Sequence, residues 1–103
     1  MERINKIQEM LKANPTDSFL NHALALEYIK LGDDAAAQNL FEQLLEREPG
    51  YVGSYYHLAK LLERNGKEQE AIAVYEKGMH MAKEKGDQHA FGELRSAWEE
   101  LTF

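Results

Sequence analysis

The sequence repeats itself at an interval of 34 residues, and this period restricts the possible folds more than any other feature. Shifting the chain by 34 positions places Leu24-Ala25 on Leu58-Ala59 and Gly32 on Gly66. The same shift places Ala37 on Ala71, Phe41 on Tyr75, Glu42 on Glu76, Ile7 on Phe41, Met10-Leu11 on Leu44-Leu45, and Pro15 on Pro49. A fixed period of this length is typical of stacked supersecondary units. Because the first residues match the second half of a unit, the chain is predicted to begin with a half-repeat.

Apolar residues recur every three or four positions along the chain, and no run alternates cleanly with a period of two, so we expect an all-α fold. Six helices are predicted, separated by Asn14-Pro15, Gly32, Pro49-Gly50, Asn65-Gly66 and Gly86. The short connections imply that neighbouring helices are antiparallel. Candidate N-caps are Thr16, Asp17 or Ser18 for the second helix, Asp33 or Asp34 for the third, and Asp87 for the sixth. The predicted buried stripes include Ile4, Ile7, Met10 and Leu11 in the first helix, Leu20, Leu24, Tyr28 and Leu31 in the second, and Ala90, Leu94, Ala97, Trp98 and Leu101 in the sixth.

The charge of the chain argues against nucleic acid as a partner. The sequence has 12 Lys and Arg against 18 Asp and Glu, a net charge of −6 with His neutral, whereas a phosphate backbone needs clustered basic residues.

The 103 residues include no Cys, which excludes disulfides and Cys-type metal sites. The start, Met1–Lys6, has no apolar signal-peptide core, and no stretch approaches the ~18 apolar residues of a membrane span. We therefore expect a soluble, cytoplasmic protein with no membrane partner, folded as a single domain over residues 1–103.

These patterns resemble the tetratricopeptide repeat (TPR) family, a 34-residue helix–turn–helix, and in particular its small stand-alone bacterial-type members. The resemblance rests on Leu24, Ala25, Tyr28, Gly32, Ala37, Phe41 and Pro49 in one repeat and on Tyr55, Leu58, Ala59, Gly66, Ala71 and Tyr75 in the next. It implies a right-handed superhelix with a leading half-repeat (2–14), two full repeats (18–51 and 52–85) and a C-terminal capping helix (87–102). The chain departs from the family pattern at Asn21, where Trp is common, at Lys83, where the second repeat would end in Pro, and at Gly92-Glu93, where Leu-Ala would stand.

Residue types that could carry chemistry do not converge at any spacing. A zinc site needs three or four close ligands, and His22, His57, His80 and His89 form no pattern such as His-Glu-x-x-His. The glycines are isolated helix ends rather than a phosphate-binding loop, and Ser18, Ser54 and Ser96 lack the setting of a nucleophile. We therefore expect no catalytic residue, no metal and no cofactor, and we predict that the protein is not an enzyme.

The family resemblance implies a concave groove, lined by the first helix of each repeat, that receives peptides or other protein segments. Carried over position by position, its residues are Phe19, His22, Ala23, Leu26 and Lys30 in the first full repeat and Gly53, Tyr56, His57, Lys60 and Arg64 in the second. The clamp that some members use for chaperone tails is not matched, because His22, Leu26 and His57 stand where it needs Lys or Asn. Aromatic and apolar anchors with a basic rim suit an amphipathic helix or an extended acidic-apolar peptide.

Two alternatives stay open. Phe19, Leu26 and Tyr56 could serve packing rather than binding. The chain could also be a structural unit that forms a homodimer through its end helices or its groove, because a solenoid of two repeats leaves apolar end faces. Near the sixth helix, Met79, Met81 and Phe91 are either core residues or part of such a patch, and Trp98 is expected to anchor the capping helix by packing inward.

Overall fold

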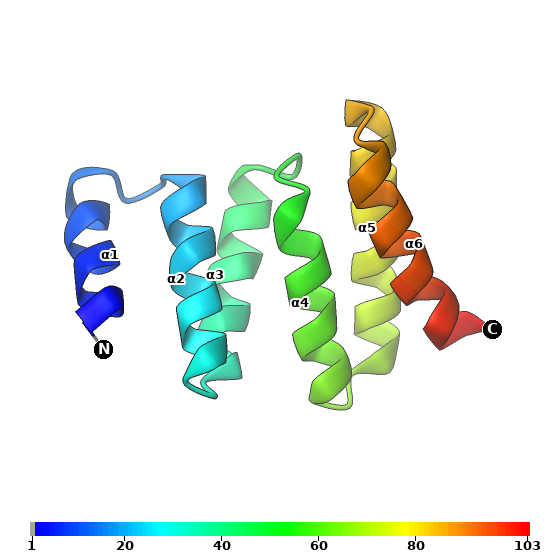
Figure 1. The fold of residues 1–103 in the computed structure, drawn as a ribbon, viewed down its shortest axis with the longest axis horizontal. Coiled ribbons are helices and arrows are strands. Elements are labelled where there is room, and N and C mark those ends of the chain that lie inside the picture. Colours follow the sequence, from blue (N-terminus) through cyan, green and yellow to red (C-terminus); the bar gives the residue numbers. More distant parts are fainter. Residues whose placement is uncertain (1) are drawn as a thin grey trace. The chain divides into compact units, whose positions relative to one another are not determined.

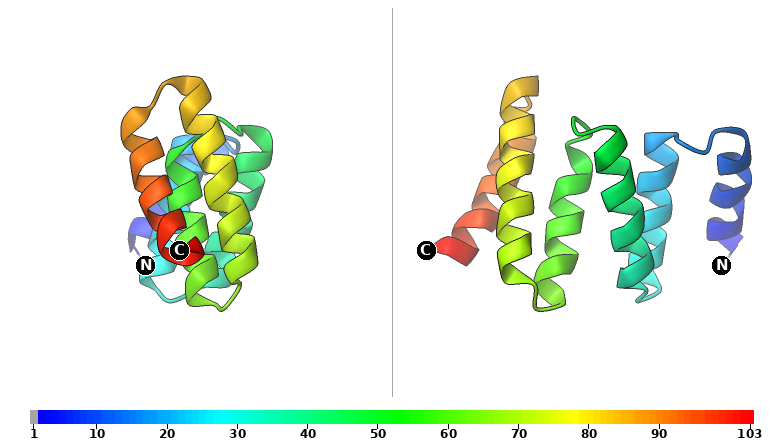
Figure 2. Two further views of the ribbon diagram at one scale, coloured as in Figure 1. Left: turned by 90° about the vertical axis from the view of Figure 1, so that its right-hand side faces the viewer. Right: turned by 180° about the vertical axis from the view of Figure 1, so that it is seen from behind.

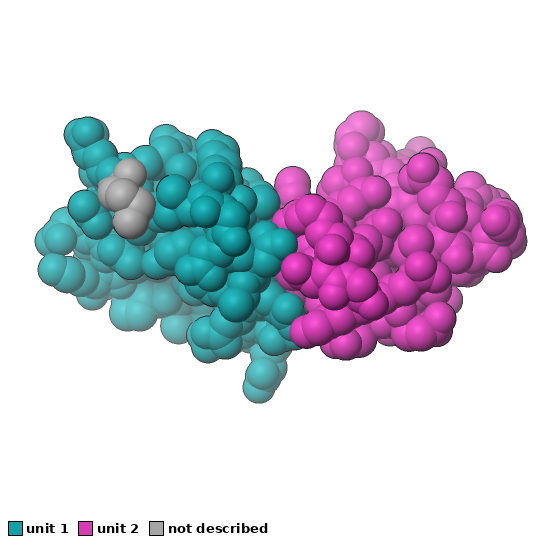
Figure 3. Space-filling model, turned by 90° about the horizontal axis from the view of Figure 1, so that it is seen from below, with its two compact units in different colours: residues 1–48 teal, residues 49–103 magenta. Residues whose placement is uncertain are grey.

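The computed structural model describes residues 2–103, and all of its regular structure is helical. The six helices are α1 (Glu2–Ala13), α2 (Ser18–Lys30), α3 (Asp34–Arg47), α4 (Gly53–Arg64), α5 (Glu68–Lys85) and α6 (Gln88–Thr102) (Figure 1). The all-α prediction and the number of helices are confirmed for the described residues. Residue contacts divide the chain into two compact units, residues 1–48 and 49–103, which Figure 3 colours separately. Met1, part of the predicted single domain of residues 1–103, lies outside the described residues, and that domain stays a prediction.

The first unit consists of α1 and the α2–α3 hairpin. Ile4 and Ile7 of α1 are buried against Leu24 of α2, with smaller contributions from the surrounding half-buried residues. The short side chains of Ala25 and Ala37 are fully buried, which lets α2 and α3 approach closely. These contacts make α1 part of a shared core rather than an isolated helix, as a stacked-repeat fold requires.

The second unit consists of α4, α5 and α6. In each view of Figure 2, α6 runs beside α5, and α6 also contacts α4. Tyr55 is buried at the start of α4, and its hydroxyl donates to the carbonyl of Pro49 at 2.5 Å. Leu94 and Ala97 bury α6 in this unit. The capping helix predicted for residues 87–102 is therefore packed along its length.

Local backbone chemistry places the helix ends where the sequence predicts them. Asp17, Asp33 and Asp87 each accept a hydrogen bond from a backbone N–H in the first turn of α2, α3 and α6, at 2.9, 3.1 and 3.0 Å. Such caps satisfy N–H groups that have no partner within the helix. At two of the chain reversals, Gly32 and Gly66 have φ angles of 80° and 77°, a region that glycine enters without a steric penalty.

Three expectations about burial are wrong. Met10 is 50% exposed, because it lies on the face of α1 with Asn5 and Glu9 rather than with Ile4 and Ile7. Leu31 is 52% exposed, because it follows the last turn of α2 as its C-cap. Trp98 is only half-buried, and its indole N–H donates to the Glu76 carboxylate at 3.0 Å.

Asn21 shows how the chain dispenses with the large residue that the family often has at this position. Its side chain is buried, and its amide donates to the backbone carbonyls of Asp17 at 2.8 Å and Pro15 at 3.1 Å. A buried amide is tolerated when its hydrogen bonds are made. Asn21 therefore ties the loop after α1 to the first turn of α2 through polar contacts, where a large apolar residue would act by packing.

Candidate protein-binding faces

The residues predicted to bind a partner lie on the first helix of each repeat, α2 in one unit and α4 in the other. We call the first set the α2 face and the second the α4 face. The α2 face comprises Phe19, His22, Ala23, Leu26 and Lys30. The α4 face comprises Gly53, Tyr56, His57, Lys60 and Arg64. Each face is described within its own unit.

Phe19 dominates the α2 face. Its side chain is 67% exposed in the first turn of α2, whereas Ala23 and Leu26, one and two turns further along, are half-buried. The spacing of four and three residues places all three on one side of the helix. The His22 ring packs edge-on against the buried Phe41 ring, with centroids 5.8 Å apart. His22 is therefore held by the core of the unit, and the exposed apolar surface of this face comes chiefly from Phe19.

The cation of the α2 face is already paired within the chain. Lys30 Nζ lies 3.1 Å from the Glu27 carboxylate, and Arg3 Nε of α1 lies 3.0 Å from the same oxygen. The hydrogen bond from Lys30, followed by that from Arg3, lowers the pKa of Glu27 below its ordinary value, against an opposing effect of burial. One carboxylate is shared by two cations, so the group keeps a net charge of +1, but Lys30 is already engaged by Glu27 and an acidic partner would have to compete with it.

Aromatic and cationic side chains make contact along the α4 face. The half-buried Tyr56 and His57 rings meet edge-on with centroids 5.7 Å apart. Lys60 Nζ lies 5.6 Å from the centre of the Tyr56 ring and 3.6 Å from the Glu63 carboxylate. Arg64 is exposed at the end of the helix. The structure thus brings Tyr56, His57 and Lys60 into one contiguous surface.

Glu63 links this surface to the core of the second unit. Its carboxylate accepts a hydrogen bond from the hydroxyl of the fully buried Tyr75, besides pairing with Lys60. Burial lowers the pKa of His57, and the negative charge of Glu93 on α6 partly opposes that effect. His57 is consequently disposed to be neutral, so the cationic character of the α4 face rests on Lys60 and Arg64.

The acidic partners of the two lysines are residues that the sequence analysis missed. Glu27 precedes Lys30 by three positions and Glu63 follows Lys60 by three, a spacing at which side chains on a helix are neighbours. That spacing is visible in the sequence and could have identified both pairs. The α2 face therefore presents the exposed Phe19, the α4 face presents half-buried aromatic rings, and Lys30 and Lys60 are each engaged by a carboxylate of the chain.

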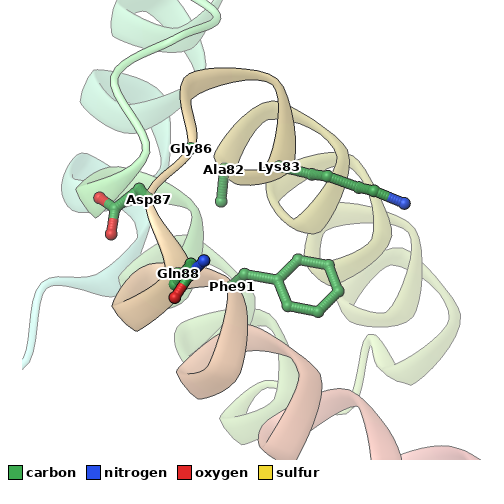
Figure 4. Close-up of a pocket in the computed structure, with 6 residues that line it drawn as sticks. All are labelled: Ala82, Lys83, Gly86, Asp87, Gln88 and Phe91. Carbon is green, nitrogen blue, oxygen red and sulfur yellow. The ribbon is translucent and has the colours of Figure 1, made fainter.

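A separate pocket of about 360 Å³ lies outside both faces, at the turn between α5 and α6. Figure 4 shows the Phe91 ring and the Lys83 side chain extending in the same direction, with Ala82 near the end from which both extend. Within residues 2–103, no three His, Asp or Glu side chains are placed to hold a metal ion. The described helices also include none that is long and apolar enough to cross a membrane.

Together these observations define a helical-hairpin repeat protein in which the first helix α2 presents an exposed aromatic side chain, Phe19. The tetratricopeptide repeat family model matches residues 22–80, and the chain belongs to the tetratricopeptide repeat family. The family resemblance stated from the sequence is therefore confirmed. Members of this family are generally protein–protein interaction modules, and their fold is typically a non-enzymatic scaffold.

Solved structures share the fold over most of the chain. The crystal structure of a tetratricopeptide repeat domain protein from Salinibacter ruber is 42% identical, has a TM-score of 0.80, and aligns over 84% of this chain and 96% of its own. A solution NMR structure of a tetratricopeptide repeat domain protein from the same organism gives 42% identity and a TM-score of 0.82, over 85% and 89% of the two chains. The crystal structure of MamA aligns over 82% of this chain and 49% of its own, with a TM-score of 0.77 and 21% identity, and shows similarity of fold alone.

A curated relative matches part of the chain. The tetratricopeptide repeat and J domain-containing co-chaperone DNJ1 of Cryptococcus neoformans is 34% identical over 58 residues, which is 56% of this chain. The match spans 11% of the length of that co-chaperone. The similarity therefore concerns the repeats and not the co-chaperone as a whole.

Proposed function

We propose that this chain is a non-enzymatic interaction module that docks a partner peptide or helix on the first helices of its repeats, through the α2 face and the α4 face. The observation that carries the proposal is Phe19, an aromatic side chain that is 67% exposed on a first helix. Exposed aromatic side chains with small neighbours are typical anchors of protein interfaces. Family membership supports the same function, because tetratricopeptide repeats generally bind proteins.

The paired cations define the kind of partner that suits these faces. Lys30 and Lys60 are each within 3.6 Å of a carboxylate of this chain, so an acidic partner would have to compete with Glu27 and Glu63. Burial of apolar surface then supplies more of the affinity than charge does. We therefore favour an amphipathic helix, with apolar residues against Phe19 and Leu26 on the α2 face or against Tyr56 on the α4 face, over an extended acidic peptide.

The test is a selection of displayed helical peptides on the immobilised chain, followed by affinity measurement with purified peptides. Phe19→Ala is the main variant, since its side chain is mostly exposed and its removal leaves the buried core intact. We expect at least a tenfold loss of affinity, which corresponds to about 1.4 kcal/mol. Tyr56→Ala tests the α4 face in the same assay.

Met10→Ala is the matched control, because Met10 is also a large, half-exposed apolar residue but lies on α1, outside both faces. We expect it to bind the selected peptides as the wild type does. Peptides that bind Phe19→Ala, Tyr56→Ala and wild type equally would place binding elsewhere and refute the proposal.

A further inference from the structure

Two stripes of side chains form a mixed surface on the α5–α6 hairpin, and this surface shares no residue with the α2 and α4 faces. We call it the hairpin face. Its α5 stripe is Ile72, Glu76, Met79 and Lys83, and its α6 stripe is Phe91, Arg95, Trp98 and Thr102. Both stripes follow the spacing of four, three and four residues that keeps side chains on one side of a helix. Ile72, Met79, Phe91 and Trp98 are all half-buried, so part of each remains open to a partner.

Two observations show which residues of the α5 stripe lie beside which residues of the α6 stripe. The indole N–H of Trp98 donates to Glu76 at 3.0 Å, and Phe91 lines a pocket with Lys83. Since α5 and α6 are antiparallel, Lys83 and Phe91 mark one end of the face, and Glu76 and Trp98 lie about two turns away. Met79 and Arg95 fall between these two pairs.

The charges of the hairpin face are arranged to complement a second copy of the same face. In residues 2–103, Lys83 takes part in no hydrogen bond or ion pair, and Glu76 accepts only from Trp98. Consider a two-fold axis that lies in the plane of the face, perpendicular to both helices, and passes near Met79 and Arg95. This axis would place each Lys83 opposite Glu76 of the second copy. The same operation places each Phe91 opposite Trp98 of the second copy. Such self-complementarity is what a two-fold interface requires.

The residues near the two-fold axis and the aromatic residues at the ends of the face are compatible with this dimer. Arg95, near the axis, has its charge balanced by Glu99, with Nε 3.4 Å from the carboxylate. The Phe103 ring packs edge-on against Trp98, with centroids 5.8 Å apart, and is 91% exposed. The pocket beside Phe91, about 360 Å³ in volume, is large enough to receive an aromatic ring.

We propose that the hairpin face is a self-association surface, and that its occupant is a second copy of this chain with α6 antiparallel to α6. The face has only eight residues, four on each helix, so the dimer is expected to be weak and in exchange with the monomer. This surface gives the homodimer alternative of the sequence analysis a defined location. It is independent of the α2 and α4 faces, so either activity can fail without the other.

The test combines sedimentation velocity with fluorescence over a dilution series of the chain. Trp98 is the single tryptophan of the sequence, so burial by the second copy should shift its emission to shorter wavelength as concentration rises. Lys83→Glu and Glu76→Lys each place like charges opposite one another in a homodimer. We expect each variant alone to weaken dimerisation by at least tenfold, because like-charge juxtaposition is costly at an interface.

The decisive measurement mixes the two variants. The chain with Lys83→Glu carries a carboxylate at both positions of the pair, and the chain with Glu76→Lys carries an ammonium group at both. In a mixed pair these opposite charges face each other, so the heterodimer should form when neither variant associates alone.

Lys77→Glu is the matched control, because it makes the same change of charge at an exposed position of α5 outside the face and should dimerise as wild type does. A wild-type chain that stays monomeric up to near-millimolar concentration overturns the proposal. So does a dimer that all the variants form equally well.

Discussion

Gly78 of α5 lies directly against Tyr55 of α4. A Cβ atom at position 78 would come within 2.7 Å of the Tyr55 Cβ and 3.1 Å of Leu94 Cδ1 on α6. The three helices of the second unit therefore meet at a point where only a hydrogen atom fits. Tyr55 cannot yield easily, because its Cβ moves only with the backbone and its hydroxyl is held by the Pro49 carbonyl.

Gly78→Ala should accordingly destabilise the protein although alanine is the better helix former. Overpacking a buried site costs about 1–3 kcal/mol, whereas the gain in helix propensity is about 1 kcal/mol. We expect a net loss of up to about 2 kcal/mol in the free energy of unfolding, measured by urea denaturation. Gly92→Ala is the matched control, because a Cβ there meets no atom within 4 Å. It should stabilise the chain by about 0.5–1 kcal/mol, and equal effects of the two substitutions would contradict the close contact.

Alkaline pH should destabilise the second unit through its buried tyrosines. Burial raises the pKa of Tyr55, and burial together with the hydrogen bond to Glu63 raises the pKa of Tyr75, each from an ordinary value of 10.0. Above pH 10 the unfolded chain releases these protons while the folded chain retains them. Stability is therefore fully present below pH 10 and is lost as the pH rises towards the folded-state pKa values, with a slope of at most about 1.4 kcal/mol per pH unit for Tyr75, whose pKa is raised strongly.

Tyr75→Phe isolates this effect. The variant should be less stable near neutral pH by about 1 kcal/mol, for the lost hydrogen bond. Above pH 10 its stability should fall less steeply than that of the wild type, as measured by urea denaturation at a series of pH values. Because lysines also titrate in this range, the difference between the two slopes is the informative quantity. Identical slopes would mean that Tyr75 does not keep its proton in the folded state.

Ile7→Ala should release α1 from the first unit. Ile7 is buried with Ile4 and Leu24, and truncating a buried isoleucine costs about 2–5 kcal/mol. A helix of 12 residues is marginal in water without such packing. Hydrogen exchange should therefore show α1 amides losing protection while those of α4, α5 and α6 keep theirs. Met10→Ala, on the exposed side of α1, should change exchange little, and protection of α1 that survives Ile7→Ala would refute this role of Ile7.

Features that depend on the local backbone were predicted well from the sequence. The aspartate caps and the helix ends at Gly32 and Gly66 follow from short-range chemistry, and the 34-residue period aligns Ala25 with Ala59 and Ala37 with Ala71, all four of which are fully buried. The period carries this information because each repeat buries the same positions against the same neighbours. The predicted helix boundaries are accordingly close to those of α1 to α6.

Burial on the terminal helices was predicted less well, because it depends on packing that the period does not describe. In α6 the predicted stripe is confirmed at Leu94 and Ala97, which are buried, whereas Trp98 of the same stripe is only half-buried. Gly78 allows α5 to lie close to Tyr55 of α4 and Leu94 of α6. The half-burial of Trp98 could not be read from its position in an apolar stripe, because its indole N–H donates to the Glu76 carboxylate.

Glu63→Gln tests whether internal pairing sets the charge of the α4 face. The substitution keeps an oxygen that can accept from Tyr75 but removes the negative charge 3.6 Å from Lys60. Salt screens unpaired exposed charges most strongly, so wild-type affinity for a peptide selected on this face should vary little between low and physiological salt. In Glu63→Gln, Lys60 becomes available to the partner. A peptide with an added Glu should then bind the variant severalfold more tightly at low salt, and this gain should vanish at high salt. If the acidic peptide already binds the wild type with the same strong salt dependence, Lys60 is available despite Glu63, and the preference for an apolar helix over an acidic peptide is wrong.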